Sequence, residues 1–176
     1  YPLVTGVQTC ALPIYLACTY CYEHQEDERL FDVDIAKRII SQAFADPNFD
    51  EIEVDFFGGE PFVGYKAMRR ICEHLWQGKW SKPFICFATT NGTLVHGSIK
   101  KWVFENRHRL ILGLSLDGTP EMHNRNRGGS FDQIDLDFFR DAWPEQPVKM
   151  TLSRETLPKM AAGIIYLQRL GFRVVC

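Results

Sequence analysis

Three of the six cysteines lie close together near the start of the chain, at Cys10, Cys18 and Cys21. Cys18 and Cys21 form a Cys-x2-Cys pair with Tyr20 between them. Two intervening residues let both sulfur atoms turn toward one metal, so this spacing suits half of a zinc site, a redox pair or part of an iron–sulfur site. The pair alone leaves these interpretations open, together with one in which both thiols are unligated.

Three further turns could contribute polar groups to a site, and each follows a segment with the pattern of a strand. Their glycines let a ligand approach the backbone, and Glu60 adds a carboxylate. Arg125 and Arg127 follow the third turn, and a guanidinium binds a carboxylate through two parallel hydrogen bonds. Taken separately, each of these turns is commonplace. In chain order, the three turns are Gly58-Gly59-Glu60-Pro61, Thr90-Asn91-Gly92 and Ser115-Leu116-Asp117-Gly118.

Alternating helices and strands must position these turns. Periodicity and capping signals predict helices over 33–45, 64–77, 97–106, 131–142 and 157–169, with Asp32 and Ser130 as N-caps of the first and fourth. Strands are predicted at 52–56, 84–89, 110–116, 148–152 and 172–176, and a polar loop at 119–129. This order indicates parallel βαβ units, in an open barrel or a doubly wound sheet, whose strand ends share one edge. We therefore expect the three turns to converge there.

Composition narrows the function classes. The net charge is −2, from 20 basic and 22 acidic residues that are intermixed along the chain, which argues against nucleic acid and anionic lipid as partners. No basic segment precedes the apolar start as in a signal peptide, so we expect a cytoplasmic protein with reduced thiols and no membrane segment. Cys72, Cys86 and Cys176 stand alone in apolar segments and are predicted to be core residues.

Together and in this order, the motifs resemble the radical S-adenosylmethionine (SAM) superfamily. The resemblance is closest to the SPASM-type maturases that modify peptides and proteins, which include the anaerobic sulfatase-maturating enzymes. That family shows Cys-x3-Cys-x2-Cys with an aromatic residue in the last spacer, then Gly-Gly-Glu-Pro, Thr-Asn-Gly, and Ser-Leu-Asp-Gly with a downstream arginine. The match runs from Leu16 to the end of the chain. It implies an α/β fold, a partial (β/α)6 TIM-like barrel that is truncated at both ends.

The resemblance also implies a [4Fe-4S] cluster and SAM as cofactors. Three thiolates would bind the cluster, of which this chain supplies Cys18 and Cys21, and leave one iron open to SAM. The SAM-binding residues implied by the family pattern are Tyr20, Gly58, Gly59, Glu60, Asn91, Ser115 and Arg127, with Arg125 as the weaker of the two arginines. Among the histidines, His24 and His123 are expected to be solvated loop residues, and the others helix-surface or turn residues.

The family's chemistry is reductive cleavage of SAM to a 5′-deoxyadenosyl radical, which abstracts hydrogen from a substrate. The resemblance implies a peptide or protein substrate and an electron donor such as flavodoxin or ferredoxin. Related maturases continue into a C-terminal extension that often carries further clusters and largely selects the substrate, so this chain does not indicate which substrate is modified.

The start of the chain departs from the family pattern. Position 14, where the first cluster cysteine should stand, is Ile14, and Cys10 has the wrong spacing to replace it. Residues 1–14 resemble the translation of a sequencing-adapter oligonucleotide, so we expect the protein proper to be a partial core domain over 15–176, inactive with Ile14 in place of cysteine.

The residues also suit two other function classes less well. A zinc-binding structural or interaction module could use Cys10, Cys18 and Cys21 with a histidine such as His24. It would not account for the turns at Gly58–Pro61 and Ser115–Gly118. A metal-free phosphate-binding barrel requires a glycine-rich loop late in the chain, and the sequence shows none.

Overall fold

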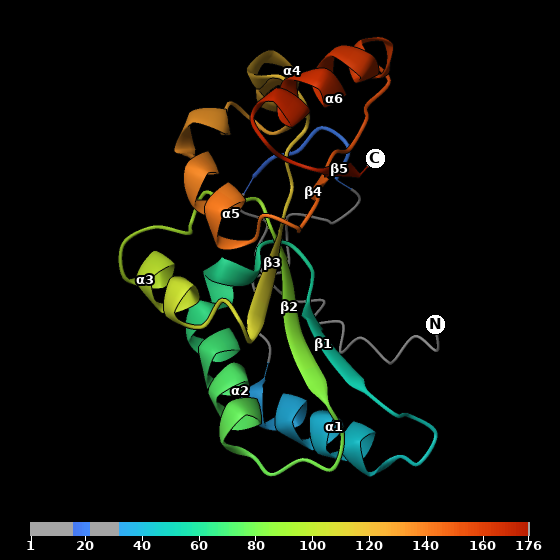
Figure 1. Cartoon of the computed structure of the whole chain (residues 1–176), viewed down its shortest axis with the longest axis vertical. Coiled ribbons are helices and arrows are strands. Elements are labelled where there is room, and N and C mark those ends of the chain that lie inside the picture. The colour runs from blue at the N-terminus through green and yellow to red at the C-terminus, as the bar shows by residue number, and fades with distance from the viewer. Residues whose placement is uncertain (1–15, 22–31, 176) are drawn as a thin grey trace.

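A parallel β-sheet organises the fold (Figure 1). The computed structural model describes residues 16–21 and 32–175. Strands β1 (Ile52–Phe56), β2 (Phe84–Thr90) and β3 (Leu110–Leu114) pair side by side in sequence order. β4 (Val148–Lys149) and β5 (Val174–Val175) form a second parallel pair. A bridge between Ser115 and Lys149 joins the two sheets, so the strand succession continues from β3 to β4.

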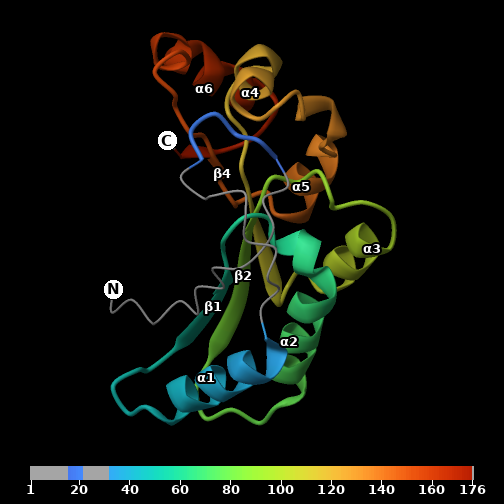
Figure 2. The same ribbon diagram turned by 180° about the vertical axis from the view of Figure 1, so that it is seen from behind.

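Three helices follow the predicted positions and pack on one face of the three-stranded sheet, as Figure 2 shows from behind. Helix α1 (Val33–Ala45) begins at Asp32, whose carboxylate accepts from the N–H groups of Asp34 and Ile35. Helix α2 (Tyr65–Gln77) follows a 3-10 turn, η1 (Pro61–Gly64), and α3 (Gly97–Glu105) precedes β3. Their apolar sides and alternate strand residues form the core. Its most buried members include Ile40, Leu75, Cys86, Val103 and Leu112.

The part of the chain from 115 to 175 lies beyond the carboxyl ends of β1–β3, at the top of Figure 1. It contains α4 (Pro120–Asn126), η2 (Phe131–Gln133), α5 (Leu136–Ala142), η3 (Leu157–Lys159) and α6 (Met160–Arg169), besides β4 and β5. Gly118 lets this part pack against the sheet end: it has φ 78°, and a Cβ there would stand 3.1 Å from the Cα of Gly163 on α6. A side chain at position 118 would therefore force the two segments apart.

Two predictions between the third and fourth strands are wrong. The expected polar loop over 119–129 contains helix α4, because Thr119 accepts from the N–H of Met122 and Pro120 occupies the first turn, an N-terminal signal. Ser130 does not cap a helix through residue 142. Its backbone is helical (φ −93°, ψ 0°), whereas an N-cap needs extended backbone, and Asp135 caps α5 instead by accepting from Phe138 N–H.

The α/β class and the parallel pairing are confirmed, and the strands lie in sequence order. The described strands form an open arrangement, so the partial barrel stays a prediction. Cys72 and Cys86 are fully buried, as predicted, while Cys176 lies outside the described residues. Within the described ranges, none of the helices has the length and apolar character needed to cross a bilayer.

Candidate functional site

Glu60 connects the end of β1 to the end of β2 through hydrogen bonds. Its side chain is 1% exposed. Oε1 accepts hydrogen bonds from Thr90 Oγ1 (2.7 Å) and the Phe62 N–H (3.2 Å), and Oε2 accepts from the Asn91 N–H (2.8 Å). The carboxylate therefore holds the Gly58-Gly59 turn and the Thr90-Asn91 turn against each other.

Burial raises the pKa of Glu60 to about 7, although its three donors and the nearby Arg127 oppose the shift. An added cation near this carboxylate would favour the ionised form and lower the pKa again. The group is thus suited to respond to a positively charged ligand at the strand ends.

The remaining strand-end residues meet at the same edge. The Ser115 N–H donates to the Thr90 carbonyl (2.9 Å), which places the third turn beside the second. Asn91 Oδ1 accepts from the N–H and hydroxyl of Thr93, so this side chain shapes its own turn. Thus the structure brings together five of the predicted site residues: the half-buried Gly58 and Gly59 and the buried Glu60, Asn91 and Ser115.

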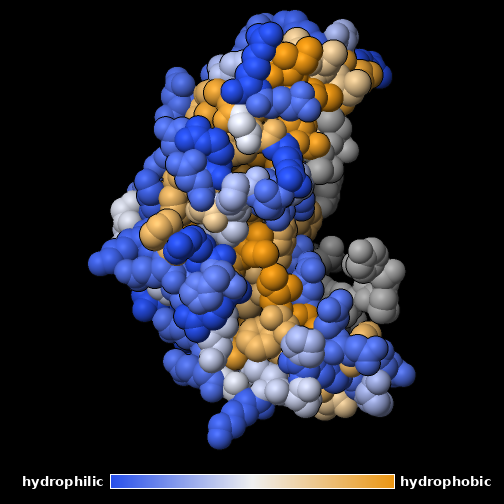
Figure 3. All heavy atoms as spheres, in the orientation of Figure 1, coloured by the Kyte–Doolittle hydropathy of each residue, from blue (hydrophilic) through white to orange (hydrophobic). Residues whose placement is uncertain are grey.

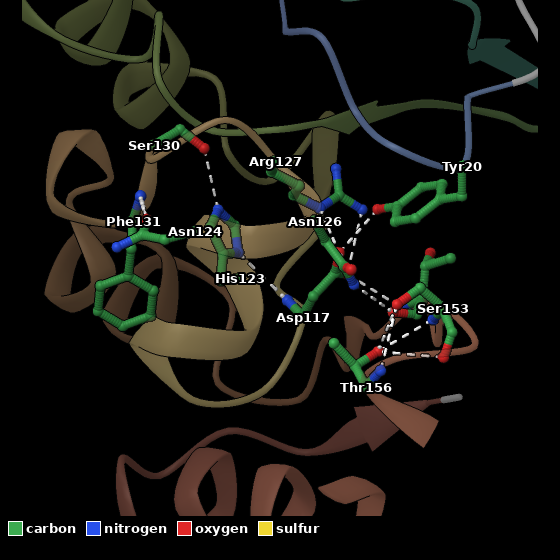
Figure 4. A network of polar contacts seen from close by, with 11 residues as sticks. Tyr20, Asp117, His123, Asn124, Asn126, Arg127, Ser130, Phe131, Ser153 and Thr156 are labelled. Carbon is green, nitrogen blue, oxygen red and sulfur yellow. Dashed lines mark hydrogen bonds and ion pairs between the residues drawn. The ribbon is translucent and has the colours of Figure 1, made fainter. Parts of the chain in front are cut away.

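A second group centres on the fully buried carboxylate of Asp117 (Figure 4). Arg127 donates to it from Nε (2.8 Å to Oδ2) and Nη2 (3.2 Å to Oδ1). Oδ2 also accepts from the Tyr20 hydroxyl (2.7 Å) and Asn126 Nδ2 (3.2 Å), and Oδ1 from the Thr151 N–H (2.9 Å). The Asp117 side chain therefore acts as an acceptor for five donor groups.

The cysteine turn is attached to this group. The Cys21 N–H donates to the Cys18 carbonyl (3.1 Å), which closes the turn, and the Thr19 N–H donates to the Asn126 carbonyl on α4 (2.9 Å). The guanidinium of Arg127 lies over the Tyr20 ring, 5.4 Å from its centre. The pair of cysteines is therefore held beside Asp117 and Arg127, at the carboxyl ends of the strands.

The two thiols are free and differ in environment: Cys18 is half-buried and Cys21 is exposed. Burial raises the pKa of the Cys18 thiol, and the positive charge of Arg127 acts in the opposite direction. With two residues between them, both sulfur atoms can turn toward one metal. The turn thus fits part of an iron–sulfur site. In the described part of the chain no three potential metal ligands form a group; position 14, Cys10 and His24 lie outside it.

His123 is not a solvated loop residue, and that prediction is wrong. It is fully buried on α4, where Nδ1 accepts from the Asp117 N–H (3.2 Å) and Nε2 contacts Ser130 Oγ (3.1 Å). Burial is the main cause that lowers its pKa to about 4, with Arg127 adding to the effect. The neutral ring therefore supports the backbone of the Asp117 turn.

Of the two arginines after the third turn, Arg127 alone reaches the site. Its side chain is 8% exposed, whereas Arg125 is 59% exposed and binds Glu155 on the surface (2.7 Å). Sequence reasoning missed Asp117, His123 and Asn126 as site residues. The available signal was the Thr119-Pro120 helix start, which predicts α4 and places residues 123 and 126 on one face.

Comparisons with known proteins agree on one family. The model of a family described as "4Fe-4S single cluster domain" matches residues 4–131. The cysteine-type anaerobic sulfatase-maturating enzyme of Clostridium perfringens strain 13 is 30% identical over 141 residues, covering 72% of this chain and 36% of the relative. That of Clostridium novyi is 28% identical over 132 residues, covering 68% of this chain and 35% of the relative.

Solved structures show the same fold. The structure described as native anSMEcpe with bound AdoMet and Cp18Cys peptide has a TM-score of 0.80 and 22% identity, over 95% of this chain and 48% of that one. Streptococcus suis SuiB bound to precursor peptide SuiA gives a TM-score of 0.65 and 19% identity, over 96% and 37%. This chain spans about a third of the length of the curated relatives and up to about half of these structures.

Proposed function

The chain belongs to the 4Fe-4S single cluster domain family, in the maturase branch of the radical SAM superfamily, and on this basis we propose that it is the core of an enzyme that modifies a peptide or protein. Its cofactors are a [4Fe-4S] cluster and SAM. When bound, they would supply an electron and a 5′-deoxyadenosyl radical that abstracts hydrogen from the substrate.

Cys18 and Cys21 would supply two of the three thiolate ligands. The turn that they form is closed by its own hydrogen bond and anchored to α4 through Thr19, so its thiols keep a fixed position relative to the strand ends. The third ligand would stand at position 14, where this sequence has Ile14. A cysteine there would complete the family's spacing.

The strand-end residues would bind SAM. Backbone carbonyls of Gly58 and Gly59 suit its ammonium group, and the buried carboxylate of Glu60 adds negative potential behind them. Arg127 has two of its N–H groups on Asp117, and a guanidinium carries further donors that suit the SAM carboxylate. Ser115 and Asn91 would complete this side, and Tyr20 would lie against the adenine.

One observation carries the proposal: Tyr20, inside the cysteine turn, and Arg127, at the predicted SAM site, share the Asp117 carboxylate. These residues come from separate parts of the chain, and no single motif requires them to meet. Their connection is what a site needs if it holds a cluster and SAM next to each other.

A peptide or protein substrate is supported by the neighbours whose structures contain bound peptides. We further propose a low-potential donor such as flavodoxin or ferredoxin, in the cytoplasm, as the source of the electron. The barrel expected from the family would enclose the reaction, with the described strands as its central part and its closure completed by segments outside them.

Anaerobic reconstitution tests the metal site. In a chain with residues 1–14 replaced by a segment that ends in cysteine, iron and sulfide contents and the electron paramagnetic resonance signal should show one [4Fe-4S] cluster. Cys18→Ala and Cys21→Ala should each abolish it, whereas Cys72→Ala, which removes a core thiol, should retain it. Full cluster content in both turn variants would refute the assignment, and tight zinc binding without a cluster would favour the zinc-module alternative.

A further inference from the structure

The sheet face opposite α1–α3 carries a second group of polar and aromatic residues. Asp55, Phe87 and Ile111 are register neighbours across β1, β2 and β3, and their side chains are only partly buried. Ile85, one pleat earlier on β2, is 37% exposed. Figure 3 shows apolar atoms at mid-height, where the strands run in Figure 1. This face begins next to the turns of the proposed SAM site.

Lys149 extends across this face from β4. Its Nζ donates to Thr89 Oγ1 on β2 (2.9 Å) and lies 5.3 Å from the centre of the Phe87 ring. Gly113 on β3 leaves the necessary room, because a Cβ there would stand 2.8 Å from Phe87 Cζ and 3.8 Å from Lys149 Cε. The ammonium group is therefore held over β2 by a partner of its own.

Asp55 lies on the β1 side of the face, next to Phe87. Its Oδ1 is buried and has no hydrogen-bond partner within the described part of the chain. Burial raises the pKa of this carboxyl, Lys149 lowers it and Glu53 raises it. A buried carboxylate oxygen without a donor costs free energy, so such a group in a native fold calls for a ligand that supplies one.

We propose that Asp55 binds a cationic side chain of the peptide substrate, a lysine or arginine near the residue that is modified. The inference rests on the proposed function and names the substrate class that this face selects. Glu53, on the same face of β1, adds negative charge, and Phe87 and Ile111 offer an apolar surface for the alkyl part of the side chain. Lys149, held over β2 by Thr89, favours the ionised form of the Asp55 carboxyl, which is the form that binds a cation.

Binding of defined peptides tests this. Three capped hexapeptides would carry lysine one, two or three residues before a cysteine, each with a matched peptide that has norleucine in place of lysine. Titration calorimetry with the reconstituted, SAM-loaded protein should show that at least one lysine peptide binds about tenfold or more tightly than its norleucine match. Asp55→Asn, which keeps the shape of the side chain, should abolish that preference, and Glu53→Gln should keep most of it.

A carbon-13 NMR titration gives a second readout that does not depend on turnover. The lysine peptide should lower the pKa of the Asp55 carboxyl, because a bound cation favours the ionised form. Equal affinity of the wild type and Asp55→Asn for all three lysine peptides, or no preference over norleucine, would overturn the inference. Cluster and SAM binding are measured on the same samples: if both are intact while the lysine preference is absent, this inference alone fails, and their loss instead counts against the proposed function.

Discussion

The Tyr20 hydroxyl donates a 2.7 Å hydrogen bond to Asp117 Oδ2, the oxygen that also binds Arg127 Nε at 2.8 Å. The aromatic residue between the two cysteines thus shares a buried acceptor with the arginine of the proposed SAM site. A displacement of either donor changes the environment of the other, since both act on one carboxylate in a region of low dielectric. We therefore expect cluster geometry and SAM affinity to be coupled through Asp117.

Arg127→Ala should weaken SAM binding at least about tenfold and leave the cluster in place. It also leaves the Asp117 carboxylate without its ion-pair partner, which should lower the free energy of unfolding by about 3 kcal/mol. Equilibrium dialysis and urea denaturation measure the two effects. Arg125→Ala is the matched control, because Arg125 is exposed and binds only a surface carboxylate in the described structure. Arg127→Lys retains the charge, so its SAM affinity should lie between those of the wild type and Arg127→Ala. SAM affinity unchanged in both Arg127 variants would remove this residue from the site.

Tyr20→Phe removes one hydrogen-bond donor and keeps the ring beneath the guanidinium. The loss of a hydrogen bond to a charged group should cost about 1.5 kcal/mol, equivalent to about tenfold in SAM affinity if the whole effect reaches the site. The reduced cluster should still form, with a changed electron paramagnetic resonance spectrum in the presence of SAM. Spectra and affinity identical to those of the wild type would show that the Tyr20–Asp117 bond does not couple the two parts.

Glu60 should make folding stability depend on pH. Its pKa of about 7 lies above the ordinary 4.5, so between these values the folded state binds a proton that the unfolded state has released. The free energy of unfolding of the wild type, relative to that of Glu60→Gln, should therefore fall by about 3 kcal/mol as pH rises from below 4.5 to above 7. Thr90→Val removes one donor, which raises the folded-state pKa and should extend the upper end of this pH range. Urea denaturation across this range provides the check; a difference that does not change with pH contradicts the assignment.

His123 predicts the opposite slope. Its pKa of about 4 lies below the ordinary 6.5, so the unfolded state binds more protons between these values. Wild-type stability relative to His123→Asn should therefore increase by about 3 kcal/mol as pH rises from 4 to 6.5, and then level off. Asn is the appropriate substitution because its Oδ1 can accept from the Asp117 N–H as Nδ1 does. Parallel pH profiles for the two proteins would mean that His123 is protonated in the fold as readily as in the unfolded chain.

The fold over residues 32–118 could be predicted because periodicity and punctuation agree there. Asp32 caps α1 as expected, and β1 occupies the alternating segment. Prediction failed over 119–135, where a composition-based loop assignment overlooked the Thr119-Pro120 cap and so missed α4, whereas α5 lies within the predicted helix. The consequence was functional, because α4 presents His123 and Asn126 to Asp117.

Motifs predicted that the three strand-end turns would converge and did not predict how they bind one another. Glu60 was expected to face a ligand, yet its oxygens already bind Phe62, Thr90 and Asn91. The motifs indicate Asp117 only as part of a turn, yet its carboxylate accepts a hydrogen bond from Tyr20, which lies 97 positions earlier in the chain. Such long-range pairing depends on tertiary packing, which local sequence patterns do not contain.

The most direct test is formation of 5′-deoxyadenosine from SAM. Residues 1–14 would be replaced by a segment that carries cysteine at position 14, the protein reconstituted anaerobically and reduced, and the product quantified by liquid chromatography. We predict 5′-deoxyadenosine from this protein. We predict none from the chain with Ile14, and none when Cys18→Ala is added to the protein with cysteine at position 14. A repaired chain that assembles no [4Fe-4S] cluster and forms no 5′-deoxyadenosine would contradict the assignment of this chain as a radical SAM core.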